Sequence, residues 1–236
     1  MIPIGDSVPN SSWPVVTWGL IGLNVWVFLY EVTLGPDLEA FIQTWAFIPA
    51  QYFLLADTAP GEWAARYVPI FSSMFLHGGW AHLIGNMVYL WIFGDNVEDR
   101  LGHFRYLAFY LLSGVAAALV QAHLHPDSAI PTVGASGAIS GILGAYLVLF
   151  PTARVYTLVP LLLFFPVLEF PAVLYLGIWF LMQLVSGTAS LTLAADAGGV
   201  AWWAHVGGFV VGVVLAPILR RRESYPKVWR DQYAPW

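Results

Sequence analysis

The sequence contains no cysteine and few charged residues, and both absences narrow the class of protein it can be. Without cysteine there is no disulfide, no thiol nucleophile and no thiolate metal site, so covalent chemistry has to come from oxygen or nitrogen nucleophiles. Only 10% of the 236 residues are charged and 59% are hydrophobic, whereas an average soluble domain is about 25% charged. With a mean hydropathy of +0.71, the chain is expected to be an integral membrane protein in contact with the lipid bilayer.

Several partners and chemistries are disfavoured in the same way. The net charge of −5 is small and dispersed, so nucleic acid is not an expected partner. No H-E-x-x-H motif of a zinc protease is present, because "HLIGN" lacks the glutamate. His123, His125 and Asp127 in "HLHPD" are of metal-ligand types but have weak spacing, and we expect them in a loop or at the interface. Neither a metal nor another cofactor is predicted.

Apolar runs define the expected spans. About 20 residues are needed to cross roughly 30 Å of hydrocarbon, and five runs meet this need: 14–34, 80–97, 104–123, 172–188 and 201–219. We expect residues 155–170, interrupted by prolines, to be interfacial. A sixth run, 137–151, gives only about 22 Å of helix. This helix must therefore start below one surface of the membrane.

Lysine and arginine set the expected orientation, because they accumulate on cytoplasmic loops. With six spans and a cytoplasmic N-terminus, only Arg66 is external. Eight are cytoplasmic: Arg100, Arg105, Arg154, Arg220, Arg221, Arg222, Lys227 and Arg230. The expected organisation is a cytoplasmic segment at 1–13, a membrane domain at 14–219 and a basic cytoplasmic tail at 220–236. The long external segment 35–79 is too apolar for a free loop and should lie on or in the interface.

Four polar side chains are predicted at one depth, just inside the outer leaflet. His205 lies about 6 Å into the last span, and His82 and Asn86 lie about 3 and 9 Å into the second. Ser136 opens the short helix, whose start must also be sunk. Irregular backbone such as "PTVGAS" is tolerated at this depth only where protein buries it or it lines a wet cavity. The sequence therefore predicts a water-filled pocket.

Small residues at four-residue steps allow the helices that carry Ser136 and His205 to approach closely. One stripe contains Gly137, Gly141 and Ala145, and the other contains Ala204, Gly208, Gly212 and Ala216. His205 shares a face with Gly208 and Gly212. We therefore expect Ser136 and His205 to come within hydrogen-bonding distance.

This pair suits acyl transfer, because a hydroxyl becomes nucleophilic beside a neutral imidazole. Asn86, His82 and the first N–H groups of the Ser136 helix would stabilise an oxyanion. No acid is expected at this depth, so we predict a dyad whose imidazole is oriented by packing and small polar groups. Alternatively, Ser136 is only a helix N-cap and His205 only ties two helices together.

Four motifs together resemble the rhomboid intramembrane serine proteases: "GASG" at 134–137, "AHVGG" at 204–208, "HGGWAHLIGNM" at 77–87 and "VEDRLG" at 97–102. The resemblance implies a six-helix, all-α membrane bundle with a half-submerged external first loop and a fifth span that gates substrate entry. It makes Ser136 the nucleophile, His205 the base, and His82 and Asn86 oxyanion donors. Supporting roles fall to Gly134 and Gly137, and structural ones to His77, Glu98, Arg100, Gly208 and Gly212. Glu98 and Arg100 are expected to hold a cytoplasmic helix end by ion pairing.

The family's substrates are typically single-pass membrane proteins, and its active site would open to the external side of a cell membrane. Two positions depart from some relatives. Val68-Pro69 replaces a Trp-Arg pair in the first loop, and Ser140 replaces a tyrosine that stacks on the catalytic imidazole, a role that Trp202, Trp203 or Ser140 itself could take. A catalytically silent relative that binds membrane-protein clients is the alternative function. A transporter or channel would need a polar path to the cytoplasm, which the segments "GILGAYLVLF" and "GGFVVGVVLA" do not offer.

Overall fold

The computed structural model describes residues 2–160, 164–192 and 200–221. Within these residues the chain is mostly helical, as predicted for an all-α membrane bundle of the rhomboid kind. The longer helices are α1 (Val15–Thr33), α5 (Trp80–Leu101), α6 (His103–Leu124), α7 (Ser136–Leu149), α8 (Ala172–Thr192) and α9 (Trp202–Leu219). Most of the predicted tail, residues 222–236 with Arg222, Lys227 and Arg230, lies outside the described residues.

Four of these helices are long and apolar enough to cross a membrane, namely α1, α6, α8 and α9. α7 is apolar but has only 14 residues, or about 21 Å. α5 is long but more polar, since it carries His82, Asn86 and the acidic sequence at its end. The protein is therefore a multi-pass membrane protein, and six spans remain the prediction if α5 and α7 are included.

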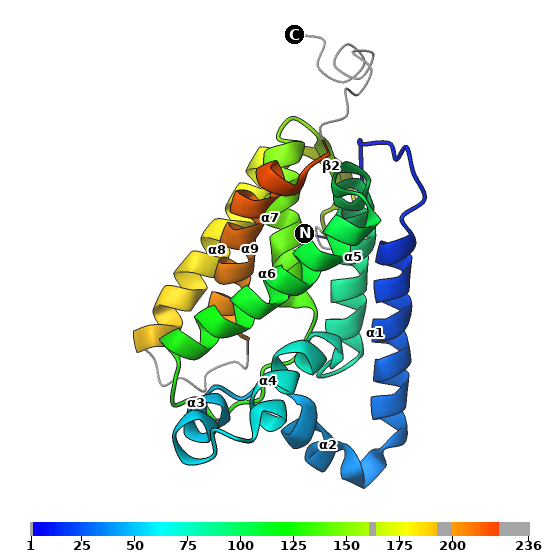
Figure 1. The fold of residues 1–236 in the computed structure, drawn as a ribbon. Helices are drawn as coiled ribbons and strands as arrows, with labels where there is room; N and C mark the ends of the chain where they lie inside the picture. The colour runs from blue at the N-terminus through cyan, green and yellow to red at the C-terminus, as the bar shows by residue number, and fades with distance from the viewer. Residues whose placement is uncertain (1, 161–163, 193–199, 222–236) are drawn as a thin grey trace.

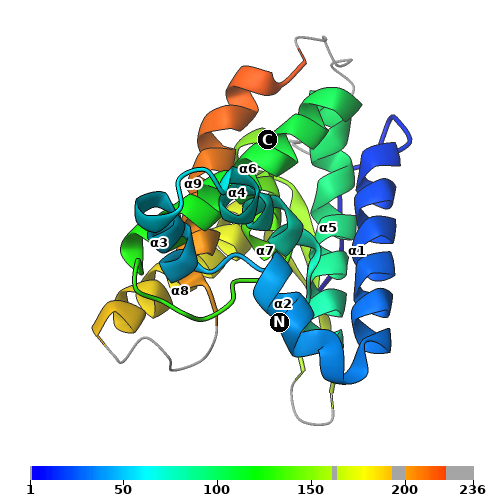
Figure 2. The same cartoon turned by 60° about the horizontal axis from the view of Figure 1, so that its bottom comes forward.

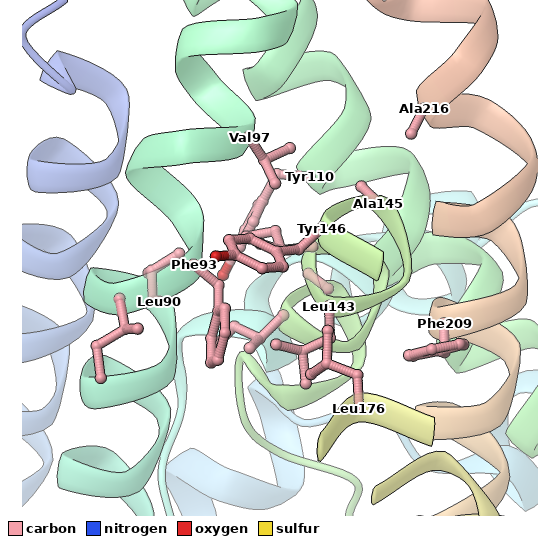
Figure 3. Packing of buried hydrophobic residues seen from close by; sticks show 14 of the residues in the cluster. Leu90, Phe93, Val97, Tyr110, Leu143, Ala145, Tyr146, Leu176, Phe209 and Ala216 are labelled. Carbon is pink, nitrogen blue, oxygen red and sulfur yellow. The ribbon is translucent and has the colours of Figure 1, made fainter. Parts of the chain in front are cut away.

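α7 occupies the centre of the bundle and packs against α5, α6, α8 and α9. Figure 3 shows its Leu143 and Tyr146 pointing among side chains from the surrounding helices. The buried neighbours come from every side: Leu90, Phe93, Val97, Tyr110, Leu176 and Phe209. This helix, which is too short to cross the membrane alone, is therefore surrounded by other helices of the protein.

The predicted close approach of α7 and α9 is present. An added Cβ at Gly208 would lie 2.0 Å from the carbonyl oxygen of Gly137, and one at Gly212 would lie 1.9 Å from that of Gly141. From the α7 side, a Cβ at Gly144 would lie 2.1 Å from the carbonyl oxygen of Phe209. Backbone therefore packs directly on backbone, which only glycine permits at these positions.

A small antiparallel sheet covers part of one end, and the sequence analysis did not predict it. β1 (Ile2–Asp6) pairs with β2 (Arg154–Leu158), which pairs with β3 (Val167–Pro171). Within the segment 155–170, expected to be interfacial, residues 155–158 and 167–170 thus lie in paired strands, and the predicted N-terminal segment supplies the third strand of the sheet. The Asp6 carboxylate accepts hydrogen bonds from Tyr146 of α7 and Asn96 of α5, which ties the sheet to the bundle.

The segment between α1 and α5 folds into short helices at the other end of the molecule, as Figures 1 and 2 show. These are η1 (Gly35–Asp37), α2 (Leu38–Trp45), α3 (Pro49–Thr58), α4 (Trp63–Ser72) and η2 (Ser73–Phe75). Phe47 and Thr132 exchange backbone hydrogen bonds, and Gly134 N–H donates to the carbonyl oxygen of Ser73. The first loop is thereby fastened to the strand-like segment that leads into α7.

Glu98, on α5, binds the start of α1 at the end of the bundle near the sheet. Its fully buried carboxylate accepts hydrogen bonds from the backbone N–H groups of Val16 and Thr17, in the first turn of α1, and lies 2.6 Å from Nδ1 of His103. Glu98 therefore caps the first turn of α1, and ion pairing between Glu98 and Arg100 stays a prediction. The guanidinium of Arg100 lies over the ring of Phe150.

Replacing Glu98 by alanine should lower the free energy of unfolding by about 3 kcal/mol, because buried N–H groups of α1 lose a charged acceptor. Glu98→Gln, which keeps an acceptor oxygen, should lose less. Thermal unfolding in detergent measures both. Glu39→Ala is the matched control, since Glu39 is exposed and accepts a hydrogen bond from Gln43 one turn away; a drop as large in this control would contradict the capping role.

Candidate active site

Ser136 is the first residue of α7, and the backbone before it determines its position. Gly134 has φ +117°, a conformation that L side chains rarely adopt, and lets the chain turn sharply into the helix. Ala135 is already helical, so the Ser136 side chain projects from the first turn. The first N–H groups of a helix lack partners within it, and their dipoles favour negative charge nearby. Ser136 thus sits where a developing anion can be stabilised.

His205 lies in the first turn of α9 and faces Ser136. Its Nε2 is 2.8 Å from Oγ of Ser136, a hydrogen-bonding distance. The contact joins residues 69 positions apart and depends on the close glycine packing of α7 on α9. The structure therefore brings together the two side chains that the sequence singled out as nucleophile and base.

Nδ1 of His205 contacts a residue that the sequence analysis missed. Oε1 of Gln183, on α8, lies 2.8 Å from this nitrogen. The Trp179 ring, also on α8, lies beside the imidazole at a centroid distance of 6.1 Å and a tilt of 37°. Among the tryptophans considered from the sequence, Trp202 meets the imidazole edge-on, whereas Trp203 donates to the carbonyl oxygen of Gly187.

Ser140, which stands where some relatives have a stacking tyrosine, lies one turn below Ser136. Its hydroxyl donates a hydrogen bond of 2.7 Å to the carbonyl oxygen of Ser136. This bond satisfies the hydroxyl within α7 and stiffens the turn that carries the nucleophile. Aromatic contact with His205 comes instead from Trp179 on α8 and from Trp202 on α9 itself.

Asn86 and His82 lie on α5, beside the backbone that leads into Ser136. A Cβ added to Gly134 would lie 2.6 Å from Nε2 of His82 and 3.4 Å from Nδ2 of Asn86, so both donors border the backbone beside Ser136. Nδ2 of Asn86 is buried and has no hydrogen-bond partner among the residues that the structure describes. Because the Gly78 N–H donates to Nδ1 of His82, Nε2 carries the proton in the neutral ring. Two N–H donors are thus available beside the serine.

His77, predicted to be structural, packs behind His82 away from Ser136. Its ring contacts the rings of Phe28 and His82, and its backbone N–H donates to the carboxylate of Glu31. Burial is the largest cause that lowers the pKa of His77, to about 4, so the ring is neutral at pH 7. His77 therefore supports the start of α5 by packing and adds no positive charge to the site.

A cavity of about 500 Å³ lies beside the Ser136–His205 pair. Its lining includes Ser136, His205, His82, Asn86 and Trp179. The mixture of polar and apolar groups fits the pocket predicted from the sequence, with space beside the serine for a peptide segment. Within the described parts of the chain, no three histidine or acidic side chains are grouped to hold a metal ion.

The first loop is anchored by contacts other than the Trp-Arg pair of some relatives. The guanidinium of Arg66 lies 4.4 Å from the ring centroid of Tyr52 and 5.1 Å from that of Tyr67. The hydroxyl of Ser72 donates to the carbonyl oxygen of Trp45. With Val68-Pro69 inside α4, these cation–π and hydrogen-bonding contacts hold α2, α3 and α4 together.

Comparison with known proteins adds a family to this geometry. Residues 64–222 match the model of the rhomboid domain. The mitochondrial Rhomboid protein 1 of Saccharomyces cerevisiae is 31% identical over 206 residues, which cover 84% of this chain and 51% of the yeast protein. Rhomboid protease AarA of Providencia stuartii is 30% identical over 214 residues, which cover 85% of this chain and 71% of that protein.

A third relative is Rhomboid protease GluP of Bacillus subtilis, which is 36% identical over 136 residues. That alignment covers 57% of this chain and 24% of the Bacillus protein. The chain spans about half the length of the yeast relative and a larger part of the Providencia protease. Two of these three relatives are named as proteases.

Proposed function

Because this chain belongs to the rhomboid family, we propose that it is an intramembrane serine protease that cleaves other membrane proteins in or beside their transmembrane segments. The observation that carries the proposal is the 2.8 Å contact between Oγ of Ser136 and Nε2 of His205, at a cavity large enough for a peptide segment. Neither residue needs a metal or cofactor for this chemistry.

The proposed reaction begins with transfer of the Ser136 hydroxyl proton to Nε2 of His205 while Oγ attacks the carbonyl carbon of the scissile peptide bond. The negative oxygen that forms would be stabilised by Asn86, His82 and the N–H groups beside Gly134 and Gly137. His205 then gives its proton to the leaving nitrogen, and the C–N bond breaks. Water in the cavity, deprotonated by His205, attacks the acyl-enzyme and frees Ser136.

Stabilisation of the oxyanion is the role that best explains the unpartnered Asn86 amide. A buried donor without an acceptor costs free energy in the resting protein. An anionic oxygen beside it would satisfy that donor only when the reaction reaches its tetrahedral stage. An interaction made only at that stage lowers the barrier without tightening substrate binding.

The proposed substrates are single-pass membrane proteins, as the family resemblance implies. The position of the cavity among largely apolar helices of a multi-pass membrane protein supports a substrate that lies in the membrane. The test is incubation of the purified protein in liposomes with single-pass reporter proteins, followed by mass spectrometry of the products. A single cut in or beside the reporter's span supports proteolysis. Stable capture of intact reporters without a cut would favour the client-binding alternative.

We further propose that both chain termini face the cytoplasm and that the active site opens to the external side. The absence of cysteine gives a direct test, because single cysteines can be introduced without background labelling. In intact bacterial spheroplasts, a membrane-impermeant maleimide should label Asp57→Cys and Asp127→Cys, two exposed positions at the end with the short helices. Thr152→Cys, an exposed position beside β2, should be labelled only after permeabilisation; the reverse pattern would overturn this orientation.

A further inference from the structure

We propose that Gln183 is a positioning residue for His205, a role that rests on the proposed function of the Ser136–His205 pair. Gln183 is 6% exposed and lies on α8, a helix that is otherwise strongly apolar. An amide in such a helix has a desolvation cost unless its polar atoms are paired. Both of its polar groups are paired, one of them with the imidazole.

The orientation of the Gln183 amide follows from its second contact. Nε2 of Gln183 donates to the backbone carbonyl oxygen of Trp179, one turn earlier in α8. A flipped amide would place an oxygen against this carbonyl oxygen, and two acceptors repel each other. Oε1 must therefore face His205, where it can only accept a hydrogen bond.

This orientation selects one tautomer of His205. Because Oε1 of Gln183 is an acceptor at 2.8 Å, Nδ1 of His205 has to carry the proton. In the neutral ring Nε2 is then unprotonated and accepts the hydroxyl proton of Ser136. When Nε2 takes that proton, the Nδ1–H bond to Gln183 persists, since a neutral amide does not take up the proton. Gln183 thus keeps the imidazole in the form that acts as a base.

Aromatic contacts constrain the imidazole of His205 less than its hydrogen bond to Gln183 does. Trp179 is tilted by 37° to the imidazole and Trp202 meets it edge-on, with centroids more than 6 Å away in both cases. Such contacts limit the room around the ring but do not distinguish its two nitrogens. The hydrogen bond from Nδ1 to Gln183 does distinguish them, because only one nitrogen can reach Oε1 while the other reaches Ser136.

The competing explanation is that Gln183 merely fills space between α8 and α9. Two substitutions separate these roles. Gln183→Met keeps the length of the side chain but removes the acceptor, whereas Gln183→Glu keeps a carbonyl oxygen in either protonation state. A packing role tolerates methionine at least as well as glutamate. A positioning role requires the acceptor and favours glutamate.

The expected result for Gln183→Met is a kcat lower by about tenfold to a hundredfold with KM within about twofold, measured on a cleaved reporter. Gln183→Glu should restore kcat to within a few-fold of the wild type. Thr188→Val is the control on the same helix, because the exposed Thr188 hydroxyl donates to the carbonyl oxygen of Leu184 within α8; its kcat should not change. Equal kcat values for the methionine and glutamate variants would overturn the proposal.

A measurement without catalysis keeps the inference testable if no substrate is cleaved. Nitrogen-15 NMR of the ring in detergent-solubilised protein, assigned by comparison with His205→Asn, should show the proton on Nδ1 in the wild type. Gln183→Met should shift the ring toward a mixture of tautomers. If the wild-type ring is already a mixture, positioning by Gln183 is wrong. If the tautomer is as predicted and the protein cuts nothing, positioning stands and the proposed function fails.

Discussion

Ser136→Ala and His205→Ala should each lower the rate of reporter cleavage by about 10⁴-fold or more. Alanine at 136 removes the attacking oxygen, and alanine at 205 removes the base that lies 2.8 Å from it. Because the two residues act in the same step, the double variant should be about as active as the less active of the two single variants. Rates are measured with one reporter in liposomes at matched protein concentration.

Two control variants show that the loss is chemical. Ser113 is a buried serine on α6 whose hydroxyl has no hydrogen-bond partner in the described part of the chain, and Ser113→Ala should retain activity. His123 is exposed, and among the described residues its ring hydrogen-bonds to the carbonyl oxygen of Leu119 and contacts Phe53, so His123→Ala should also remain active. Unchanged cleavage by either Ser136→Ala or His205→Ala would show that another group does the chemistry.

Gly212→Ala should destabilise the protein by about 3 kcal/mol or more and abolish cleavage with it. The added Cβ would lie 1.9 Å from the carbonyl oxygen of Gly141, and backbone cannot rotate away as a side chain can. α9 would have to move off α7, which would also separate His205 from Ser136. Thermal unfolding in detergent and reporter cleavage measure the two effects.

The matched control is Gly177→Ala on α8. A Cβ there meets nothing within 4 Å, and alanine is the better helix former by about 1 kcal/mol. Gly177→Ala should therefore unfold at the same temperature as the wild type or higher. Similar stability for the Gly212→Ala and Gly177→Ala variants would contradict the backbone-on-backbone packing of α7 and α9.

The helices could be predicted from sequence because membrane spans are long apolar runs with clear ends. The predicted span 14–34 corresponds to α1 (Val15–Thr33), and the predicted span 201–219 corresponds to α9 (Trp202–Leu219). Ser136 and His205 could be paired because a short helix and a glycine stripe constrain depth and spacing. That pairing needed only the positions of the two residues along their helices and the helix face that His205 shares with its glycines.

The sheet could not be predicted in the same way. β1 and β2 are separated by about 150 residues, and nothing local marks residues 2–6 as the partner of 154–158. The prolines near 160 and 166 also hid the short strand β2 within a longer apolar run. Long-range strand pairing is set by tertiary packing, which overrides local propensity.

Gln183 escaped prediction for a related reason. In a soluble protein, an apolar stripe reveals which face of a helix points inward. α8 is apolar nearly all round, since lipid faces part of it, so its rotation about its own axis cannot be read from the sequence. The sequence predicted an imidazole oriented by packing and small polar groups, but it did not single out the neutral amide that accepts from Nδ1. A lone glutamine in an apolar span was the available signal.

The most direct test of the central claim is labelling of the detergent-purified protein with a fluorophosphonate probe, because this needs no known substrate. The account predicts that the wild type is labelled on Ser136, that Ser136→Ala and His205→Ala are not labelled, and that both variants keep their helical content. A folded wild-type protein that stays unlabelled in detergent and again in liposomes would contradict an activated serine at this site.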